Sequence, residues 1–511
     1  MDNSQNNIGY FPQMPVCDKH LSVELNSDFS LPDYQPEIRR LLSTRATVLS
    51  PNEYIGNSEA ELSGEIIYKI LYLGADNKVY SALLSDKYSF TAPLEFNSKC
   101  VNNDEVTLIT TCKSESVNTR VLGPRKLNIR SKLVCHVLGA SPHLYSPTLV
   151  GAHNSASIEN MILNTSCISL KKCTGEPQLL TDFIALDKQI DNVRIIDSTS
   201  SLMISECVAS GEKVNVKGEV FIKLLYCNDS ESEYPLSMLR KLPFSISIPC
   251  DGADASFECC AFGEVIDEHF NVAENGIDVE ITVVISTKCQ KNESIPYIND
   301  SYSTEREVRC TSATVPVRTA LKAYNGNLTQ NEIFSLESIK LSPNMKIIDI
   351  CSKADVNEMS EDNGRHYLKG NATYQIIYCL DGEYSSVEVN APIKYELDPR
   401  AFASLNGKPL YDATVQIISS RARADAERLF VDSELDFLLL LQSEDSIEVL
   451  SEMTFGERLS KNEDEMVLCF PDKNESLWSV AKRYGEPQRK IRVQNSINDG
   501  DEPIKKKFLI I

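Results

Sequence analysis

Apolar residues alternate with other residues in three stretches of the chain, and each stretch begins with a glycine. The stretches are Gly64 to Tyr72, Gly218 to Tyr226 and Gly370 to Tyr378. A period of two with one wholly apolar face predicts a β-strand, because successive side chains of a strand point to opposite sides. In the first stretch that face consists of Ile66, Tyr68, Ile70 and Tyr72.

The opposite face of each predicted strand carries one polar residue at a fixed place. Lys69 interrupts this face in the first stretch, and Lys223 and Gln375 occupy the same place in the other two. The glycines that open the stretches are 218 − 64 = 154 and 370 − 218 = 152 residues apart. A spacing this regular indicates that the stretches are copies of one element.

Flanking segments recur in the same order, which extends the repeat from a strand to a domain. A lead segment occupies 31–38, 186–190 and 341–344, and a trailing strand occupies 127–130, 277–280 and 429–432. At about 150 residues per domain, a chain of 511 residues holds three or four domains. Strand patterns separated by Gly, Asn and Asp clusters favour antiparallel β domains. The sequence therefore predicts a mainly β protein with three tandem β-rich copies.

The spacing of the repeats sets the expected domain boundaries. We predict an N-terminal segment and copy 1 over 1–165, copy 2 over 166–318, copy 3 over 319–455, a linker over 456–465 and a small domain over 466–511. Such a long period is typical of separate domains arranged as beads on a string rather than of a solenoid. The segments 141–160 and 303–317 are interpreted as linkers between the beads.

The composition of the chain disfavours some classes of partner and some cellular compartments. The formal net charge is −22, which disfavours nonspecific binding to nucleic acid or to an anionic membrane. No apolar run approaches the roughly 20 residues of a transmembrane helix, and no signal peptide is visible at the start. The 16 cysteines are scattered without CxxC pairs, which favours buried free thiols in a reducing compartment over disulfides.

Catalytic signatures are not found in the sequence. The six histidines show no metal-ligand spacing, and no Walker P-loop, Rossmann glycine motif or HExxH is present. Cys135 and His136 are neighbours in sequence, whereas a nucleophile and its base need to be neighbours in space. We therefore expect a protein that is not an enzyme and that has no cofactor and no metal site.

The end of the chain differs in charge and periodicity. Residues 466–511 contain nine Lys or Arg and six Asp or Glu, a net charge of +3, so the remainder carries −25. A short strand at 466–470 precedes a predicted helix with Ser476 as N-cap and Gly485 as its stop. A second helix ends near Asn495, and a last strand covers 507–511, so the order is β-α-α-β. The first helix has one apolar stripe, formed by Leu477, Val480, Ala481 and Tyr484.

The segment 477–485, Leu-Trp-Ser-Val-Ala-Lys-Arg-Tyr-Gly, resembles the first helix of LysM domains, and the second helix with its terminal Asn495 also fits that family. Two loops depart from the family pattern. Asn474-Glu475-Ser476 replaces the usual Gly-Asp-Thr, and Ile504-Lys505-Lys506 replaces the usual Pro-Gly-Gln. Because these loops form the glycan groove of LysM domains, the changes favour a protein partner over a glycan.

The repeated unit resembles the SPOCS domain through its Leu-Pro lead segment at 31–32 and its Gly-x-x-x-Tyr-x-x-x-Tyr strand, here with Tyr68 and Tyr72. Copy 2 departs from this pattern, with Ile222 at the first Tyr position. SPOCS repeats followed by a LysM domain resemble the SipL-like spore coat morphogenetic proteins. The resemblance implies a scaffold in the mother-cell cytoplasm, at the forespore surface. Its implied partners are a SpoIVA-like coat ATPase, bound through the LysM domain, and other coat proteins.

The alternative function is a peptidoglycan-binding LysM protein of the cell or spore envelope. Under either function the expected partner-binding residues lie in the LysM-like domain; they are Leu477, Trp478, Lys482, Arg483 and Asn495. Trp478 is the only tryptophan, and tryptophan is enriched at interface hot spots. It could equally cover the edge of a small core, and Lys482 and Arg483 could be part of an ordinary solvated face.

Overall fold

The computed structural model describes residues 8–96, 100, 105–186, 193–228, 234–402, 407–460, 467–498, 504 and 508–511. Strands account for most of these residues, which confirms the mainly β prediction. Part of the second lead segment (187–190), half of the predicted linker (461–465) and the lysines at 505–507 lie outside the described residues.

Seven strands make up unit 1, the first of three units of similar construction: β1 (Tyr10–Ser30), β2 (Ile38–Val48), β3 (Asn52–Ile55), β4 (Glu59–Gly74), β5 (Val79–Pro93), β6 (Thr107–Gly123) and β7 (Lys126–Leu144). One sheet has the order β1-β7-β6, and β4 is the centre of the other, paired with β2, β3 and β5. All these pairs are antiparallel, as the turn-rich sequence predicted.

Units 2 and 3 repeat this arrangement. Unit 2 contains β9 (Ile158–Thr174), β10 (Gln178–Ala185), β11 (Val193–Ala209), β12 (Lys213–Asn228), β13 (Leu236–Pro249), β14 (Glu258–Ala273) and β15 (Gly276–Ser303). Unit 3 contains β16 (Arg306–Ser335), β17 (Lys346–Asp362), β18 (Arg365–Leu380), β19 (Glu383–Glu396), β20 (Lys408–Ala424) and β21 (Arg428–Arg458). The sheets β11-β12-β13 and β17-β18-β19 correspond to the β4-centred sheet. The predicted boundaries after 165, 318 and 455 fall within β9, β16 and β21.

Each unit has its own apolar core between its two sheets. Ile66, Tyr68, Ile70 and Tyr72 are all buried in the core of unit 1, so the apolar face predicted for β4 is confirmed. The Tyr68 hydroxyl lies 2.6 Å from the Ser131 hydroxyl oxygen inside this core. A buried hydroxyl needs such a partner, because leaving it unpaired costs about 1–3 kcal/mol.

The same polar pair occurs in unit 3 and is replaced as a pair in unit 2. The Tyr374 hydroxyl lies 2.7 Å from that of Ser433. In unit 2, Ile222 occupies the position of Tyr374, and the trailing-strand repeat places Ile281 at the position of Ser433. Both isoleucines are at 0% exposure. Tyrosine and serine therefore appear together or not at all, which keeps every core hydroxyl of this set paired.

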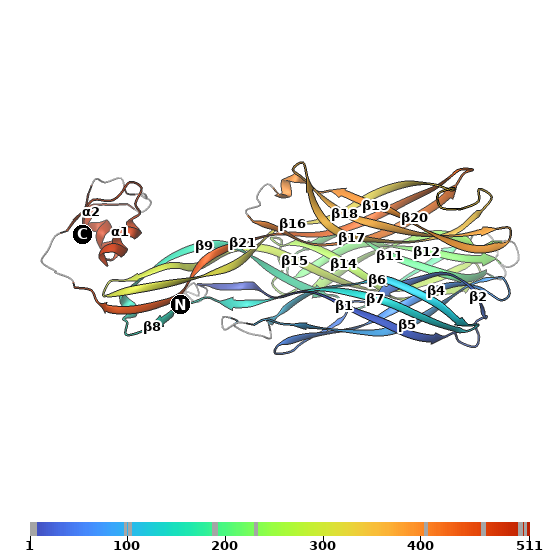
Figure 1. Cartoon of the computed structure of the whole chain (residues 1–511), viewed down its shortest axis with the longest axis horizontal. Coiled ribbons are helices and arrows are strands. Elements are labelled where there is room, and N and C mark those ends of the chain that lie inside the picture. Colours follow the sequence, from blue (N-terminus) through green and yellow to red (C-terminus); the bar gives the residue numbers. More distant parts are fainter. Residues whose placement is uncertain are drawn as a thin grey trace.

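The three units lie side by side with their long strands nearly parallel (Figure 1). Strand β5 of unit 1 contacts β11 of unit 2, β13 of unit 2 contacts β17 of unit 3, and β19 of unit 3 contacts β2 of unit 1. The contacts form a closed cycle of three. This corrects the beads-on-a-string interpretation: the units pack against one another, because both faces of their central strands carry apolar residues.

A shared apolar cluster fills the centre of this ring. Leu71 of β4, Leu225 of β12 and Ile377 of β18 belong to it, and all three lie on the strand face that the sequence shows interrupted by Lys69 or its equivalent. The strand that precedes the central strand in each of these sheets adds a bulged residue. The pairing registers of β2, β11 and β17 shift at Leu42, Ile196 and Ile348. A bulge re-aims its side chain, and here all three bulged residues enter the shared cluster.

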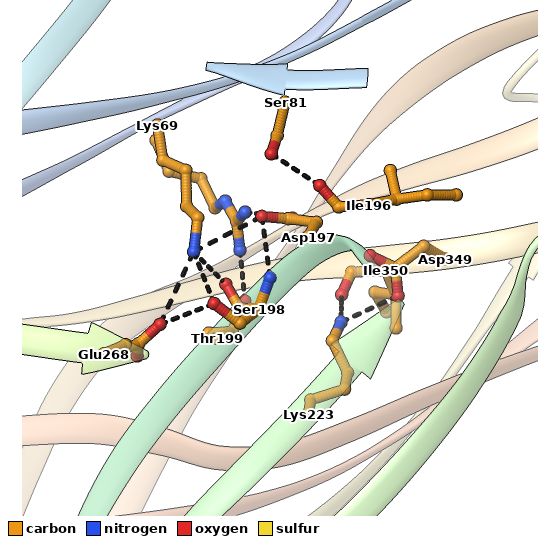
Figure 2. Close-up of polar contacts among 11 residues, drawn as sticks. Lys69, Ser81, Ile196, Asp197, Ser198, Thr199, Lys223, Glu268, Asp349 and Ile350 are labelled. Carbon is orange, nitrogen blue, oxygen red and sulfur yellow. Dashed lines mark hydrogen bonds and ion pairs between the residues drawn. The ribbon is translucent and has the colours of Figure 1, made fainter. Parts of the chain in front are cut away.

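Polar side chains join the units around this cluster (Figure 2). The Lys69 ammonium of unit 1 donates to the Ser198 backbone oxygen of unit 2 at 2.6 Å and lies 3.5 Å from Asp197 Oδ1. The Lys223 ammonium of unit 2 lies 2.8 Å from Asp349 Oδ1 of unit 3. Both aspartate side chains are only 2% exposed, so each depends on cations for solvation. Asp197 also pairs with Arg45 of β2, again a residue of unit 1.

At the equivalent position of the third junction, neither the lysine nor the aspartate is present. The Gln375 amide of unit 3 donates to the Leu42 backbone oxygen of unit 1 at 3.1 Å. Ser43 follows the bulge there, where Asp197 and Asp349 follow it in the other two units. The cation and the carboxylate have thus been exchanged together for neutral groups. At this position two junctions are charged and one is neutral, although Arg39 of β2 and Glu383 of β19 form an ion pair at 2.8 Å elsewhere in that third junction.

Strand extensions continue beyond the ring as a stalk (Figure 1). The last part of β15 pairs with β9, the first part of β16 pairs with the last part of β21, and β8 (Thr148–Val150) pairs in parallel with β21. A small apolar cluster centred on Leu450, Met453 and Phe455 stabilises the stalk. The segments 141–160 and 303–317 were predicted to be linkers, and this prediction was wrong for their strand portions, since β7 runs to Leu144 and β16 begins at Arg306.

Four cysteines of unit 2 form disulfides, Cys173 with Cys250 and Cys259 with Cys289. The other twelve cysteines are outside these two disulfides. The prediction of free thiols is therefore wrong for these four residues. Cys259 and Cys289 are directly opposite each other on β14 and β15, a relation that the sequence spacing does not reveal.

Candidate functional site

The C-terminal module, whose described residues are 467–498, 504 and 508–511, lies at the end of the stalk away from the three units (Figure 1). It contains β22 (Leu468–Cys469), α1 (Leu477–Tyr484), α2 (Gln488–Asn495) and β23 (Leu509–Ile510), with β22 and β23 antiparallel. The two helices and two strands appear in the order that the sequence predicted. Tyr302 of β15 belongs to the same apolar cluster as the core of the module.

Local sequence explains where α1 begins and ends. The Ser476 hydroxyl accepts from the Ser479 backbone N–H, so it caps the helix as predicted. Gly485 has φ 63°, a left-handed conformation that glycine adopts without a steric penalty, and its N–H donates to the Ala481 carbonyl. Leu477, Val480 and Ala481 are at 0% exposure, which confirms most of the predicted apolar stripe.

Two side chains of α1 bind one carboxylate of the stalk. The Trp478 indole Nε1 donates to Asp300 Oδ2 at 2.8 Å. The Lys482 ammonium donates to Oδ1 and Oδ2 of the same aspartate at 2.6 and 2.7 Å. Trp478 and Lys482 are four residues apart and therefore share one side of the helix. Asp300 follows a register shift in the β15–β9 pairing, a bulge that directs it to the module.

Tyr302 completes this docking contact. Its ring lies 4.9 Å from that of Trp478 at 71°, an edge-to-face arrangement that aromatic pairs favour. Burial, with a contribution from Glu159, raises the pKa of Tyr302. The phenol therefore stays protonated at neutral pH and donates to the Glu486 backbone oxygen at 2.9 Å. We call Asp300, Tyr302, Trp478 and Lys482 the docking contact.

The other residues predicted to bind a partner lie within the module. Leu477 is in its core. Arg483 pairs with Glu475 at the other side of α1. Asn495 is 7% exposed; its amide donates to the Ile510 backbone oxygen at 2.6 Å, and its side-chain oxygen accepts from the Ile510 N–H at 2.7 Å. Asn495 thereby ties α2 to β23. A partner-binding role for these five residues stays a prediction.

Sequence reasoning did not find the stalk half of the docking contact. Asp300 and Tyr302 lie in Asn299-Asp300-Ser301-Tyr302, a polar segment beside the predicted linker. The sequence does show a tryptophan and a lysine on one side of α1. This pair predicts a contact with a carboxylate that has an aromatic neighbour. Nothing in the sequence indicates which of the chain's 73 acidic residues supplies it.

Residues 189–273 match the family model described as SipL, SPOCS domain. The match covers β11, β12, β13 and β14 of unit 2. It relates the chain to SipL-type sporulation proteins. Comparison with curated proteins found no match. Comparison with solved structures found none either.

Helices are short throughout the described part of the chain. None of those helices is long and apolar enough to cross a membrane.

Proposed function

We propose that this chain is a non-enzymatic scaffold of spore coat assembly. Its C-terminal module acts as a LysM-type adaptor for a SpoIVA-like coat ATPase, and its three units offer faces to other coat proteins. The SPOCS match over residues 189–273 is the observation that carries the proposal. The proposed site of action is the forespore surface on the mother-cell side, where the chain helps the coat encase the forespore.

The placement and charge of the module support the adaptor role. It lies at the end of the stalk, so a bulky partner can approach it without meeting the three units (Figure 1). Its net charge of +3 contrasts with −25 for the rest of the chain, which favours an acidic partner surface. Linking one binding module to several other binding faces raises the effective concentration of coat proteins at the forespore.

The docking contact suggests how the partner is recognised. Asp300 presents a carboxylate to an indole N–H and an ammonium, and Tyr302 presents an aromatic edge to the same indole. A carboxylate and an aromatic side chain on the partner would bind Trp478 and Lys482 in the same way. The stalk then competes with the partner, and binding requires the module to leave the stalk.

Co-purification with the full chain tests the proposal. The chain and its variants are offered a purified SpoIVA-like ATPase and, separately, insoluble peptidoglycan. We expect retention by the ATPase, loss of retention for Trp478→Glu and Lys482→Ala, and stronger retention for Asp300→Asn. Lys490→Ala is the matched control, because Lys490 is a half-exposed lysine of α2 that pairs with Glu486 at 2.9 Å within the module.

Each outcome has a distinct meaning. Retention by the ATPase that is unchanged in all variants would place the binding surface elsewhere and contradict the role given to Trp478. Retention only by peptidoglycan would favour the alternative, a glycan-binding LysM protein. Retention by neither would reject the adaptor role.

A further inference from the structure

Two histidines that are 116 residues apart in the sequence lie opposite each other in unit 1. His20 of β1 and His136 of β7 are direct partners in the antiparallel register. Their rings are stacked, with centroids 4.1 Å apart and an interplanar angle of 7°. Their ring nitrogens therefore lie close together at the surface of one sheet.

Asp18 brings a carboxylate to the same place. It precedes His20 by two residues on β1, and residues two apart on a strand lie on the same face. Its Oδ1 is 3.0 Å from His136 Nε2. One ligand atom from each of Asp18, His20 and His136 lies within 4.8 Å of the others. In the described part of the chain, this is the group of His, Cys, Asp and Glu side chains whose spacing suits a metal ion.

We propose that Asp18, His20 and His136 bind one divalent transition-metal ion of the zinc class. Imidazole nitrogen is a preferred ligand of zinc, copper and nickel, and carboxylate oxygen completes many zinc sites. Tetrahedral zinc with bonds of about 2.0–2.1 Å holds its donor atoms about 3.3 Å apart. Asp18 and His20 are exposed, so rotation of their side chains can bring the donors to this spacing.

The surroundings leave room for the remaining ligands. Asp18 and His136 also line a cavity of about 250 Å³ whose walls include Leu138 and Leu440. Water or one small anion from the cavity or from solvent would fill the open coordination position. The cavity is further lined by Lys408 of β20, so the ion would sit where unit 1 faces unit 3. It would cross-link β1 and β7 at this junction.

Metal titration of the full, untagged chain tests this site. The protein is first dialysed against a chelator and then titrated with Zn²⁺ by calorimetry, and Co²⁺ is added to a second sample for its absorption spectrum. We expect one site with nitrogen and oxygen ligands, seen as weak cobalt bands without the intense thiolate absorption. His20→Gln and His136→Gln should each weaken binding at least about tenfold. Loss of a residue that only hydrogen-bonds to a metal ligand already lowers metal affinity by about that factor.

His269→Gln is the matched control. His269 Nε2 lies 3.0 Å from Asp267 Oδ2, so it forms a His–Asp pair at the same distance that is more exposed and lacks a second histidine. This variant should bind the ion as the unchanged chain does. Equal binding in all four proteins, or cobalt spectra dominated by thiolate ligands, would overturn the proposal. Circular dichroism verifies that His20→Gln and His136→Gln remain folded, so that a loss of binding reports on the ligands.

Discussion

The charged pair Lys223–Asp349 between units 2 and 3 should be convertible into the neutral residues found at the equivalent position between units 3 and 1. The required changes are Lys223→Gln and Asp349→Ser, which reproduce Gln375 and Ser43. Each single change should destabilise the chain, whereas the double variant should recover most of the loss. The comparison tests whether Lys223 and Asp349 are energetically coupled at the junction between units 2 and 3.

The magnitude follows from burial. The Asp349 side chain is 2% exposed, and its Oδ1 lies 2.8 Å from the Lys223 ammonium. Removing one partner of a buried ion pair costs about 3–5 kcal/mol, because the remaining charge is left without solvation. Lys223→Gln should approach this range. Asp349→Ser should cost less, because the Lys223 side chain is 18% exposed and its ammonium also donates to the Ile350 backbone oxygen.

Urea denaturation followed by circular dichroism measures these effects. The free energies of unfolding of the unchanged chain, the two single variants and the double variant form a double-mutant cycle. We expect a coupling energy of at least about 2 kcal/mol, since the two groups share one contact. The exposed pair Lys217–Glu206 in the same unit, at 55% and 47% exposure, is the control and should show no measurable coupling. Additive effects of Lys223→Gln and Asp349→Ser would refute the reasoning.

Three further predictions concern single sites. Burial raises the pKa of Asp436 to about 7. Because an unfolded aspartate titrates near 3.9, the folded chain holds this proton between about pH 4 and pH 7, and its contribution to stability falls as pH rises through that window. Asp436→Asn should therefore raise the free energy of unfolding in urea by up to about 4 kcal/mol at pH 8 and leave it unchanged near pH 4. An equal gain at both pH values would show that the raised pKa of Asp436 is not the cause. Tyr374→Phe leaves the buried Ser433 hydroxyl without its partner and should cost about 1–2 kcal/mol in urea unfolding, and no loss would show that the 2.7 Å contact adds nothing. Asp300→Ala should shift the fluorescence of Trp478, which is 6% exposed, to longer wavelength as the module undocks, and an unshifted spectrum would show that Asp300 is not needed for docking.

Local periodicity was enough to predict the elements of this fold but not their assembly. The alternation from Ile66 to Tyr72 predicts β4 and its buried face correctly, because a strand needs only its own sequence to define two faces. The stripe that begins at Leu477 predicts α1 for the same reason. Asp436, in contrast, is a buried carboxylate at a position where the repeats have Val134 and Val284, a substitution whose cost only the packed structure reveals.

Contacts between distant segments could not be read from spacing. His20 and His136 meet because β1 and β7 pair in one particular register, and a shift by one residue would separate them. Lys69 was visible as a polar interruption, yet its partner Asp197 belongs to the next unit. The repeats did contain a signal for this junction. Aspartate after the bulge occurs with lysine on the preceding unit, and serine occurs with glutamine.

The closed cycle of β5–β11, β13–β17 and β19–β2 contacts limits what this chain can polymerise into. Each junction joins two different faces, and such head-to-tail junctions produce an open filament unless the rotation closes. Here it closes after three units, so no copy of either face is left to recruit a fourth. The closed ring therefore cannot grow by adding further units through these faces. Any growth into a layer must use other surfaces, with a valency set by the outer strands and the module on its stalk.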